Sequence, residues 1–272
     1  MHNQLTTRIA DRFRDLRAKN AKGLIVYLTA GDPNLDATGD LLLALERAGV
    51  DVIELGVPFS DPLADGPVIQ RASERALRSG TTLRKILERF PSWRKTVHAP
   101  IILFSYFNPL LQFGLEKFAA TASAAGVDGA LVVDLIPEEA EHYVRAMRAH
   151  DLDTVFLASP TSTDARLERA AQLSTGFFYL ISRTGVTGER SELASSVQPL
   201  AERARRLTRL PLAIGFGIST AAQVREVQRH ADAAVVGSAV VHAIEERFSR
   251  EGPAAIEKFA RELKTGTEDQ PA

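Results

Sequence analysis

Short apolar runs alternate with amphipathic segments along almost the whole chain. Eight of these runs have the length of β-strands, at residues 24–30, 51–57, 101–106, 129–134, 153–160, 177–182, 211–217 and 233–238. The segments between them carry apolar residues three and four positions apart, which is typical of helices, as at residues 35–48, 115–125, 138–150 and 165–173. Each interval is too long for a hairpin, so the pattern predicts parallel strands covered by helices.

Eight strand and helix units predict a closed sheet. A (β/α)8 TIM barrel needs about 250 residues, so the chain suffices for one such domain over residues 1–272. The alternative is a doubly wound open sheet. Its Rossmann form expects G-x-G-x-x-G after the first strand, whereas this chain has AGDP at residues 30–33. Residues 1–20 predict an extra N-terminal helix, and the polar tail at 265–272 is expected to fray.

The connection after the second strand is unusually long. It spans residues 57–101 and contains two helical stretches, at 68–79 and 83–93, so we expect an elongated loop with an added helix. Barrel active sites are assembled from the loops that follow the strands, which makes this loop a candidate functional segment. A tolerated insertion would explain its length equally well.

Composition excludes several classes of protein. The 33 basic and 34 acidic residues give a net charge of −1, too little positive charge for broad binding to nucleic acid. The absence of cysteine excludes disulfides, Cys-ligated zinc, iron–sulfur clusters and cysteine nucleophiles, and it suits a reducing cytoplasm. No apolar run reaches the roughly 20 residues of a membrane span. We therefore expect a cytoplasmic protein with neither a nucleic-acid nor a membrane partner.

Glu54 is the first candidate for chemistry. Period-2 alternation in the second strand places Ile53, Leu55 and Val57 toward the helices and Glu54 toward the barrel interior. Burial disfavours the charged carboxylate and raises its pKa toward the range useful for proton transfer at neutral pH. A structural Lys or Arg partner is the alternative, but the strand ends contain no basic residue.

Asp65 is a second carboxylate, in the loop that follows this strand. Asp-Pro and Asp-Gly pairs, as at Asp61 and Asp65, are ordinary turn formers. A carboxylate on a rigid strand facing one on a loop is nevertheless an arrangement for acid–base chemistry that operates when the loop closes. A metal site on Asp61 and Asp65 would lack nearby histidine, so we expect no metal.

Glycines follow three successive strands in the C-terminal half. The sixth strand runs into a segment with Gly185 and Gly188, the seventh ends at Gly215 and Gly217, and the eighth ends at Gly237. Glycine leaves backbone N–H groups accessible, and the start of a helix favours an anion. This pattern indicates the phosphate site that barrels place after their last two strands.

One long segment resembles a known family. The sequence LGVPFSDPLADGPVIQ at residues 55–70 is similar to the signature of the tryptophan synthase α subunit family. Further matching segments occur in the family's order and extend the resemblance over nearly the whole chain: TAGDP at 29–33, YFNP at 106–109, SRTGVTG at 182–188 and GFGIS at 215–219.

The resemblance implies a lyase without a cofactor of its own. Members of the family cleave indole-3-glycerol phosphate to indole and glyceraldehyde 3-phosphate. By resemblance, Glu54 transfers protons at indole C3 and at the glycerol hydroxyl, while Asp65 stabilises the positive charge on the indole nitrogen. The remaining matches line the substrate pocket or bind its phosphate: Tyr27, Leu131, Tyr179 and Thr187 in the pocket, with Thr187 bonding Asp65 on closure, and Gly188, Phe216, Gly217, Gly237 and Ser238 at the phosphate.

The resemblance also implies a partner. A β subunit carrying pyridoxal phosphate would form an αββα assembly with this chain and receive indole through a tunnel, with Pro58, Asp61 and Asn108 in the contact region. Two alternatives stay open. The chain could be a binding subunit that only activates its partner, against which intact Glu54 and Asp65 argue, or a lyase that acts alone.

Overall fold

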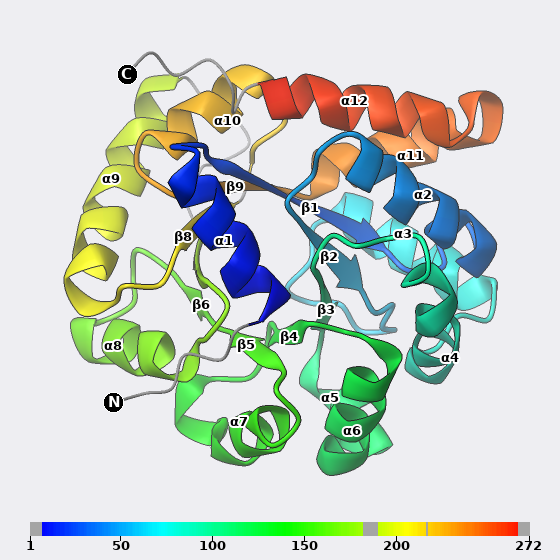
Figure 1. Cartoon of the computed structure of the whole chain (residues 1–272), viewed down its shortest axis with the longest axis horizontal. Coiled ribbons are helices and arrows are strands. Elements are labelled where there is room, and N and C mark those ends of the chain that lie inside the picture. Colours follow the sequence, from blue (N-terminus) through cyan, green and yellow to red (C-terminus); the bar gives the residue numbers. More distant parts are fainter. Residues whose placement is uncertain (1–6, 182–189, 216, 266–272) are drawn as a thin grey trace.

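Parallel strands form a ring with helices outside it, and Figure 1 looks into this ring along the shortest axis of the protein. The computed structural model describes residues 7–181, 190–215 and 217–265, apart from the side chains of 190–196. The sheet has the order β5-β4-β3-β2-β1-β9-β8-β7-β6, and every pair is parallel. The strands are β1 (Gly23–Thr29), β2 (Val52–Gly56), β3 (Ile101–Ser105), β4 (Gly129–Val132), β5 (Asp153–Val155), β6 (Leu157–Ala158), β7 (Phe178–Ile181), β8 (Leu212–Gly215) and β9 (Ala233–Val236).

The ring closes through one interrupted strand. We predicted a single strand at 153–160, and that prediction is wrong in detail because β5 and β6 are separated by Phe156. Each half pairs with a different neighbour, β5 with β4 and β6 with β7. The Phe156 carbonyl accepts a hydrogen bond from the backbone N–H of Tyr179 at 3.3 Å, which joins the two halves of the ladder. The predicted TIM barrel is therefore confirmed.

Helices cover the outside of the ring. Those in the first half are α1 (Arg8–Ala18), α2 (Leu35–Arg47), α3 (Pro67–Arg78), α4 (Leu83–Trp93), α5 (Phe107–Phe113) and α6 (Leu115–Ala125). The second half contains η1 (Pro137–Glu139), α7 (Glu141–Arg148), α8 (Asp164–Leu173), α9 (Arg190–Leu207), α10 (Ala221–Gln228), α11 (Ser238–Glu251) and α12 (Pro253–Thr265). The two helices expected between β2 and β3 are present as α3 and α4.

Two helix predictions need correction. The segment 138–150 is not one helix, because η1 ends before Ala140 and α7 begins after it. Helix α5 was not predicted, since it has only 7 residues and includes Pro109. The predicted helix at 1–20 is α1, whose N-cap Thr7 accepts a hydrogen bond from the N–H of Ala10.

Strand alternation creates two separate cores. Residues that point outward pack against the helices, among them Ile53 and Leu55 of β2. Residues that point inward fill the barrel, among them Val52 of β2 and Ile102 of β3. Because successive side chains of a strand point to opposite sides, Glu54 shares the inner side with Val52.

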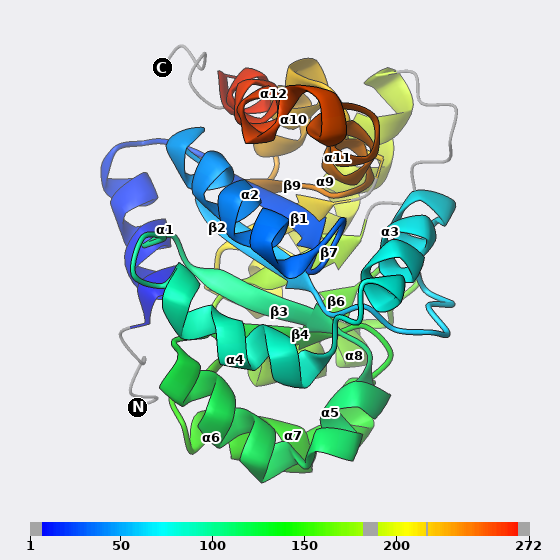
Figure 2. The same cartoon turned by 90° about the vertical axis from the view of Figure 1, so that its right-hand side faces the viewer.

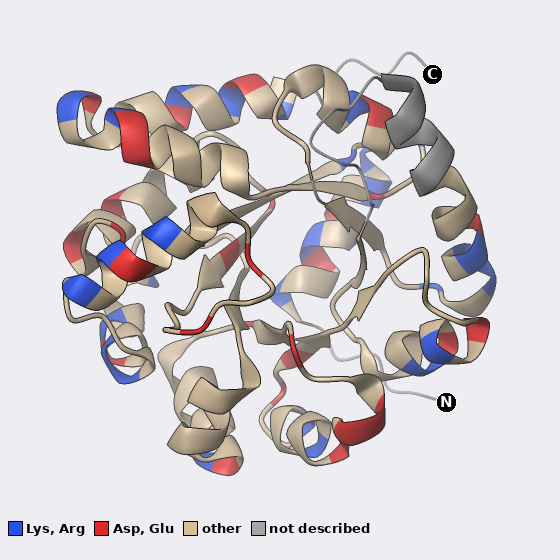
Figure 3. Cartoon of the chain, turned by 180° about the vertical axis from the view of Figure 1, so that it is seen from behind, with Lys and Arg blue, Asp and Glu red and all other residues tan. Residues whose placement is uncertain are grey.

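Helix α1 closes the amino end of the barrel. It lies across the ring in Figure 1, and its apolar residues Ile9, Phe13 and Leu16 join the interior cluster. Two of its arginines form ion pairs with buried aspartates at strand starts, Arg12 with Asp51 and Arg8 with Asp128. With that end closed, a ligand can reach the interior from the carboxyl ends of the strands, the end that faces the viewer in Figure 3.

Candidate active site

Glu54 lies inside the barrel on β2. It is only 1% exposed, and its Oε1 atom accepts no hydrogen bond from the described residues. Burial raises the pKa of its carboxyl to about 8, with no other cause contributing. The expected inward orientation is therefore observed. At neutral pH the group is mostly a protonated carboxyl and can donate a proton.

Two buried tyrosines flank Glu54. Tyr27 is the register partner of Glu54 across β1 and β2, and Tyr179 lies on β7. Burial raises the pKa of both hydroxyls well above the ordinary value, and the charge of Glu54 raises each further. Asp65 also raises the pKa of Tyr27, so Tyr27 lies within the electrostatic field of both carboxyl groups. The Tyr27 hydroxyl shares a 3.2 Å hydrogen bond with that of Thr29.

Two glycines make room for these tyrosines. A Cβ atom on Gly56 would lie 2.1 Å from the Tyr27 hydroxyl oxygen, and one on Gly215 would lie 2.2 Å from the Tyr179 hydroxyl oxygen. Both glycines are needed for space, since neither has a positive φ. Our sequence reasoning missed this role. Glycine inside a strand was the available signal, because it often marks a close approach of another group.

Asp65 lies between β2 and α3 and is held by two side chains. The Tyr106 hydroxyl donates to Asp65 Oδ2 at 3.1 Å and accepts the Ala64 N–H at 2.9 Å. The Gln70 amide donates to the Asp65 carbonyl at 2.9 Å. Partial burial raises the pKa of Asp65 to about 6, and the hydrogen bond from Tyr106 opposes that rise. At pH 7 the carboxyl is therefore mostly ionised.

Tyr106 is a site residue that the sequence did not identify as such. It stands directly after β3, and its ring lies 5.1 Å from that of Phe59 in the Asp65 connection. Burial raises the pKa of its hydroxyl above the ordinary value, and the charge of Asp65 raises it further. Its position after a strand and its place in the family-like segment YFNP at residues 106–109 were the available signals.

The helix that follows β9 has an open N-terminus. Helix α10, after β8, is capped by its own residues, because Gln223 Oε1 accepts the N–H groups of Ser219 and Thr220. Helix α11 begins after Gly237 without a side-chain cap from the described residues. An uncapped first turn favours an anion. Gly237 and Ser238, two of the predicted phosphate residues, stand at this helix start.

The other predicted site residues are distributed as follows. Leu131 is buried in the barrel interior. Pro58 is buried, whereas Asp61 and Asn108 are exposed. Gly217 is exposed with φ of +73°. Thr187, Gly188 and Phe216 lie outside the described residues, so the structure does not place them.

Within residues 7–181, 190–215 and 217–265, no group of three His, Cys, Asp or Glu side chains could hold a metal ion. The carboxylates considered for such a site have other partners. Asp61 accepts a hydrogen bond from Ser60, and Asp65 accepts one from Tyr106. In the same described part, no helix is long and apolar enough to cross a membrane.

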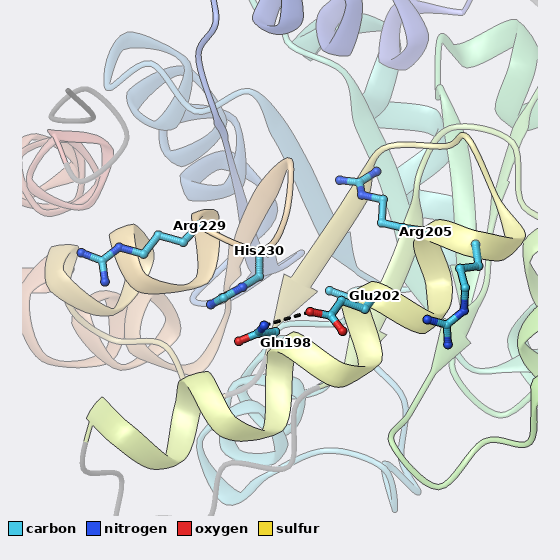
Figure 4. Close-up of a pocket in the computed structure, with 7 residues that line it drawn as sticks. Gln198, Glu202, Arg205, Arg229 and His230 are labelled. Carbon is cyan, nitrogen blue, oxygen red and sulfur yellow. Dashed lines mark hydrogen bonds between the residues drawn. The ribbon is translucent and has the colours of Figure 1, made fainter. Parts of the chain in front are cut away.

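A surface hollow between α9 and α10 belongs to the other end of the barrel. Gln198, Glu202, Arg205, Arg229 and His230 line it, and Gln198 donates to Glu202 at 2.8 Å (Figure 4). It lies where α9 and α10 lead back to the starts of β8 and β9. Barrel active sites are found at the opposite, carboxyl end of the strands, which is the end where the Asp65 connection follows β2.

Comparisons with known proteins agree on one family. A family model described as "Tryptophan synthase alpha chain" matches residues 13–268. The tryptophan synthase alpha chain of Solibacter usitatus is 55% identical over 261 residues, covering 96% of this chain and 98% of the relative. That of Geotalea uraniireducens is 49% identical over 260 residues, covering 96% and 97%. The tryptophan synthase subunit alpha of Legionella pneumophila has a similar structure, with a TM-score of 0.90 at 35% identity, covering 97% of this chain and 100% of that one.

Proposed function

The chain belongs to the tryptophan synthase alpha chain family and cleaves indole-3-glycerol phosphate to indole, and we propose that Glu54 and Asp65 perform this cleavage. The reaction is a carbon–carbon lyase step. Indole passes to a β subunit for the synthesis of tryptophan. One observation supports the assignment most strongly, which is the buried carboxyl of Glu54 inside the open end of the barrel.

Glu54 would act first as an acid and then as a base. With a pKa of about 8 it holds its proton at neutral pH and can deliver it to indole C3. The resulting carboxylate accepts the proton of the adjacent glycerol hydroxyl as the bond from C3 to the glycerol carbon breaks. Indole and glyceraldehyde 3-phosphate form, and Glu54 ends in its starting state. The proton count balances, because Glu54 gives one proton to indole C3 and takes one proton from the glycerol hydroxyl.

Asp65 would stabilise the reaction intermediate through the negative charge of its carboxylate. Protonation at C3 creates a positive charge on the indole ring system, centred on its nitrogen. Asp65, with a pKa of about 6, is mostly ionised at pH 7 and can stabilise that charge. The two carboxyl groups thus have different roles because burial differs between them. The phenol rings of Tyr27 and Tyr179 and the side chain of Leu131 would enclose the indole.

The substrate phosphate would bind where α11 begins. The N–H groups of Gly237 and Ser238 precede an uncapped first turn and favour an anion. Gly188, Phe216 and Gly217 would complete the site, and Thr187 would bond Asp65 when the site closes. These assignments follow from the family motif at residues 182–188 and 215–219.

A β subunit is the partner that the family implies. We propose an αββα assembly in which pyridoxal phosphate belongs to the β subunit and this chain uses no cofactor. Asp61 and Asn108 are exposed at the open end of the barrel, where Leu63 is 93% and Leu111 is 52% exposed. Large exposed apolar side chains suit a protein interface. Pro58, which is buried, would lie beneath the exposed residues of this surface. We also propose one domain over residues 1–272 and a cytoplasmic location.

Variants of the two carboxyl groups test this proposal. Glu54→Gln and Asp65→Asn should each lower the rate of indole release by about 100-fold or more, since each removes a proton-transfer or charge-stabilising group. Glu139→Gln, at an exposed position of the same end, is the control and should keep the normal rate. Near-normal indole release by Glu54→Gln would refute the assignment.

Adding the β subunit separates the remaining alternatives. Turnover of indole-3-glycerol phosphate should rise strongly when the β subunit is present. A rate that is high and independent of the β subunit would indicate a lyase that acts alone. A rate that stays near zero with the β subunit, while tryptophan formation from indole is stimulated, would indicate a purely activating subunit.

A further inference from the structure

Helices α3 and α11 pack against each other on the outside of the barrel, where both contact β1. Helix α3 follows the Asp65 segment, and α11 begins at the candidate phosphate site; Figure 2 shows α3 at the edge of the barrel with its preceding loop. Ala72 of α3 and Val241 of α11 share a small buried cluster with Tyr27. The apolar contact between the helices therefore lies against the candidate active site.

An ion network reinforces this contact. Arg75 of α3 binds Asp32, in the turn after β1, through two hydrogen bonds of 2.8 Å. Its third nitrogen binds Glu245 of α11 at 2.7 Å. Arg71, one turn earlier in α3, binds both oxygens of Glu245 at 3.0 and 2.8 Å. Asp32 is 3% exposed, so a buried charge depends on Arg75.

The network continues to both functional segments. On α3, Gln70 stands next to Arg71 and donates to the Asp65 carbonyl at 2.9 Å and to the Pro62 carbonyl at 3.4 Å. On α11, Glu245 lies seven residues after Ser238, a distance of about 10 Å along the helix axis. Asp65 and the first turn of α11 are thus tied together through two rigid helices.

We propose that Arg75 and Glu245 are positioning residues, which fix the Asp65 segment relative to the phosphate-binding turn of α11. This inference rests on the proposed function of Asp65 and α11. The network touches neither the scissile bond nor the indole. Its effect is to keep Asp65 where charge develops when the phosphate is bound at the other end of the substrate.

Glu245→Gln is the most informative variant. It weakens both arginine contacts to α11 but leaves the buried Asp32 paired with Arg75, so the fold is retained. We expect kcat for indole release to fall about 10-fold, since small displacements of a charged group are costly in this range. Arg75→Lys keeps a positive charge beside Asp32 but removes the planar guanidinium group that bonds both Asp32 and Glu245. We expect it to lower kcat by a similar factor.

A double-mutant cycle with Asp65→Asn distinguishes positioning from general loosening. If Glu245 acts through Asp65, Glu245→Gln should change kcat less than about twofold in the Asp65→Asn background, by single-turnover kinetics with the full-length chain and β subunit. Glu257→Gln is the matched control. Its side chain is also 26% exposed and paired with an arginine, but the pair is internal to α12. This control should leave kcat unchanged in both backgrounds.

The possible results distinguish a failure of the positioning role from a failure of the proposed role of Asp65. An equal loss of kcat in both backgrounds, or no loss in the wild-type background, would overturn the positioning role, provided that Asp65→Asn alone shows its expected loss of about 100-fold or more. Full activity of Asp65→Asn alone would instead refute the proposed role of Asp65, and the positioning role with it.

Discussion

Replacing Glu54 by Gln should remove a loss of stability that the wild type undergoes as the pH rises, while it lowers the rate of indole release by about 100-fold or more. The buried carboxyl has a pKa of about 8 against an ordinary value of 4.5, so the folded state binds a proton that the unfolded chain releases at neutral pH. The contribution of this carboxyl to the free energy of unfolding is fully present below pH 4.5 and is lost as the pH rises toward 8. Gln does not titrate, so Glu54→Gln lacks this loss.

The magnitude follows from the two pKa values. One pKa unit corresponds to about 1.36 kcal/mol. Between pH 5 and pH 7.5, the free energy of unfolding of the wild type should therefore fall by about 3 kcal/mol relative to that of Glu54→Gln. Constant differences between the two side chains, such as the hydrogen bonds of the amide, cancel in this comparison of two pH values.

Denaturant unfolding of both proteins at pH 5 and pH 7.5 measures this difference. Glu88→Gln, at an exposed position on α4, is the control and should follow the wild type at both pH values. A difference between wild type and Glu54→Gln that changes by less than about 1 kcal/mol over this range would refute the reasoning. Glu54 would then be hydrated or paired, and its use as an acid at neutral pH would lose its physical basis.

Two further predictions concern the residues around the carboxyl groups. Gly56→Ala places a Cβ against the Tyr27 hydroxyl, so it should cost about 1–3 kcal/mol of stability in denaturant unfolding, and much less in a Tyr27→Ala background; equal costs in both would contradict the contact. Tyr106→Phe removes a hydrogen bond to the ionised form of Asp65, which should raise the Asp65 pKa by about half a unit or more. An NMR titration of the Asp65 carboxyl in the substrate-free protein measures this rise, and an unchanged Asp65 pKa would mean that Tyr106 does not act on Asp65.

The sequence predicted the elements that have a strong periodic signal. The strands around Glu54 and the helices at 83–93 and 115–125 lie where their patterns place them, because buried strands and amphipathic helices leave regular spacings. The break at Phe156 left no such signal, since the apolar run is continuous there and the interruption arises from pairing with two different neighbours. Helix α5 was missed because one short helix with an internal proline has almost no periodicity.

The site was predictable in part for the same physical reason. Alternation within one strand sufficed to orient Glu54 toward the interior, and loop position sufficed to select Asp65. The functions of Tyr106, Gly56 and Arg75 depend on contacts between distant segments, such as the 42 residues that separate Ala64 from Tyr106. A single sequence does not encode such contacts in any local pattern.

The pH dependence of kcat/KM for indole release tests the central claim most directly, because it reports ionisations of the free enzyme. The substrate phosphate itself titrates near pH 6, so the alkaline limb is the informative one. If protonated Glu54 starts the reaction, kcat/KM should decline above about pH 8, and the same limb should persist in the residual activity of Asp65→Asn. A value that stays constant to pH 9.5, or an alkaline limb that also remains in Glu54→Gln, would contradict the account.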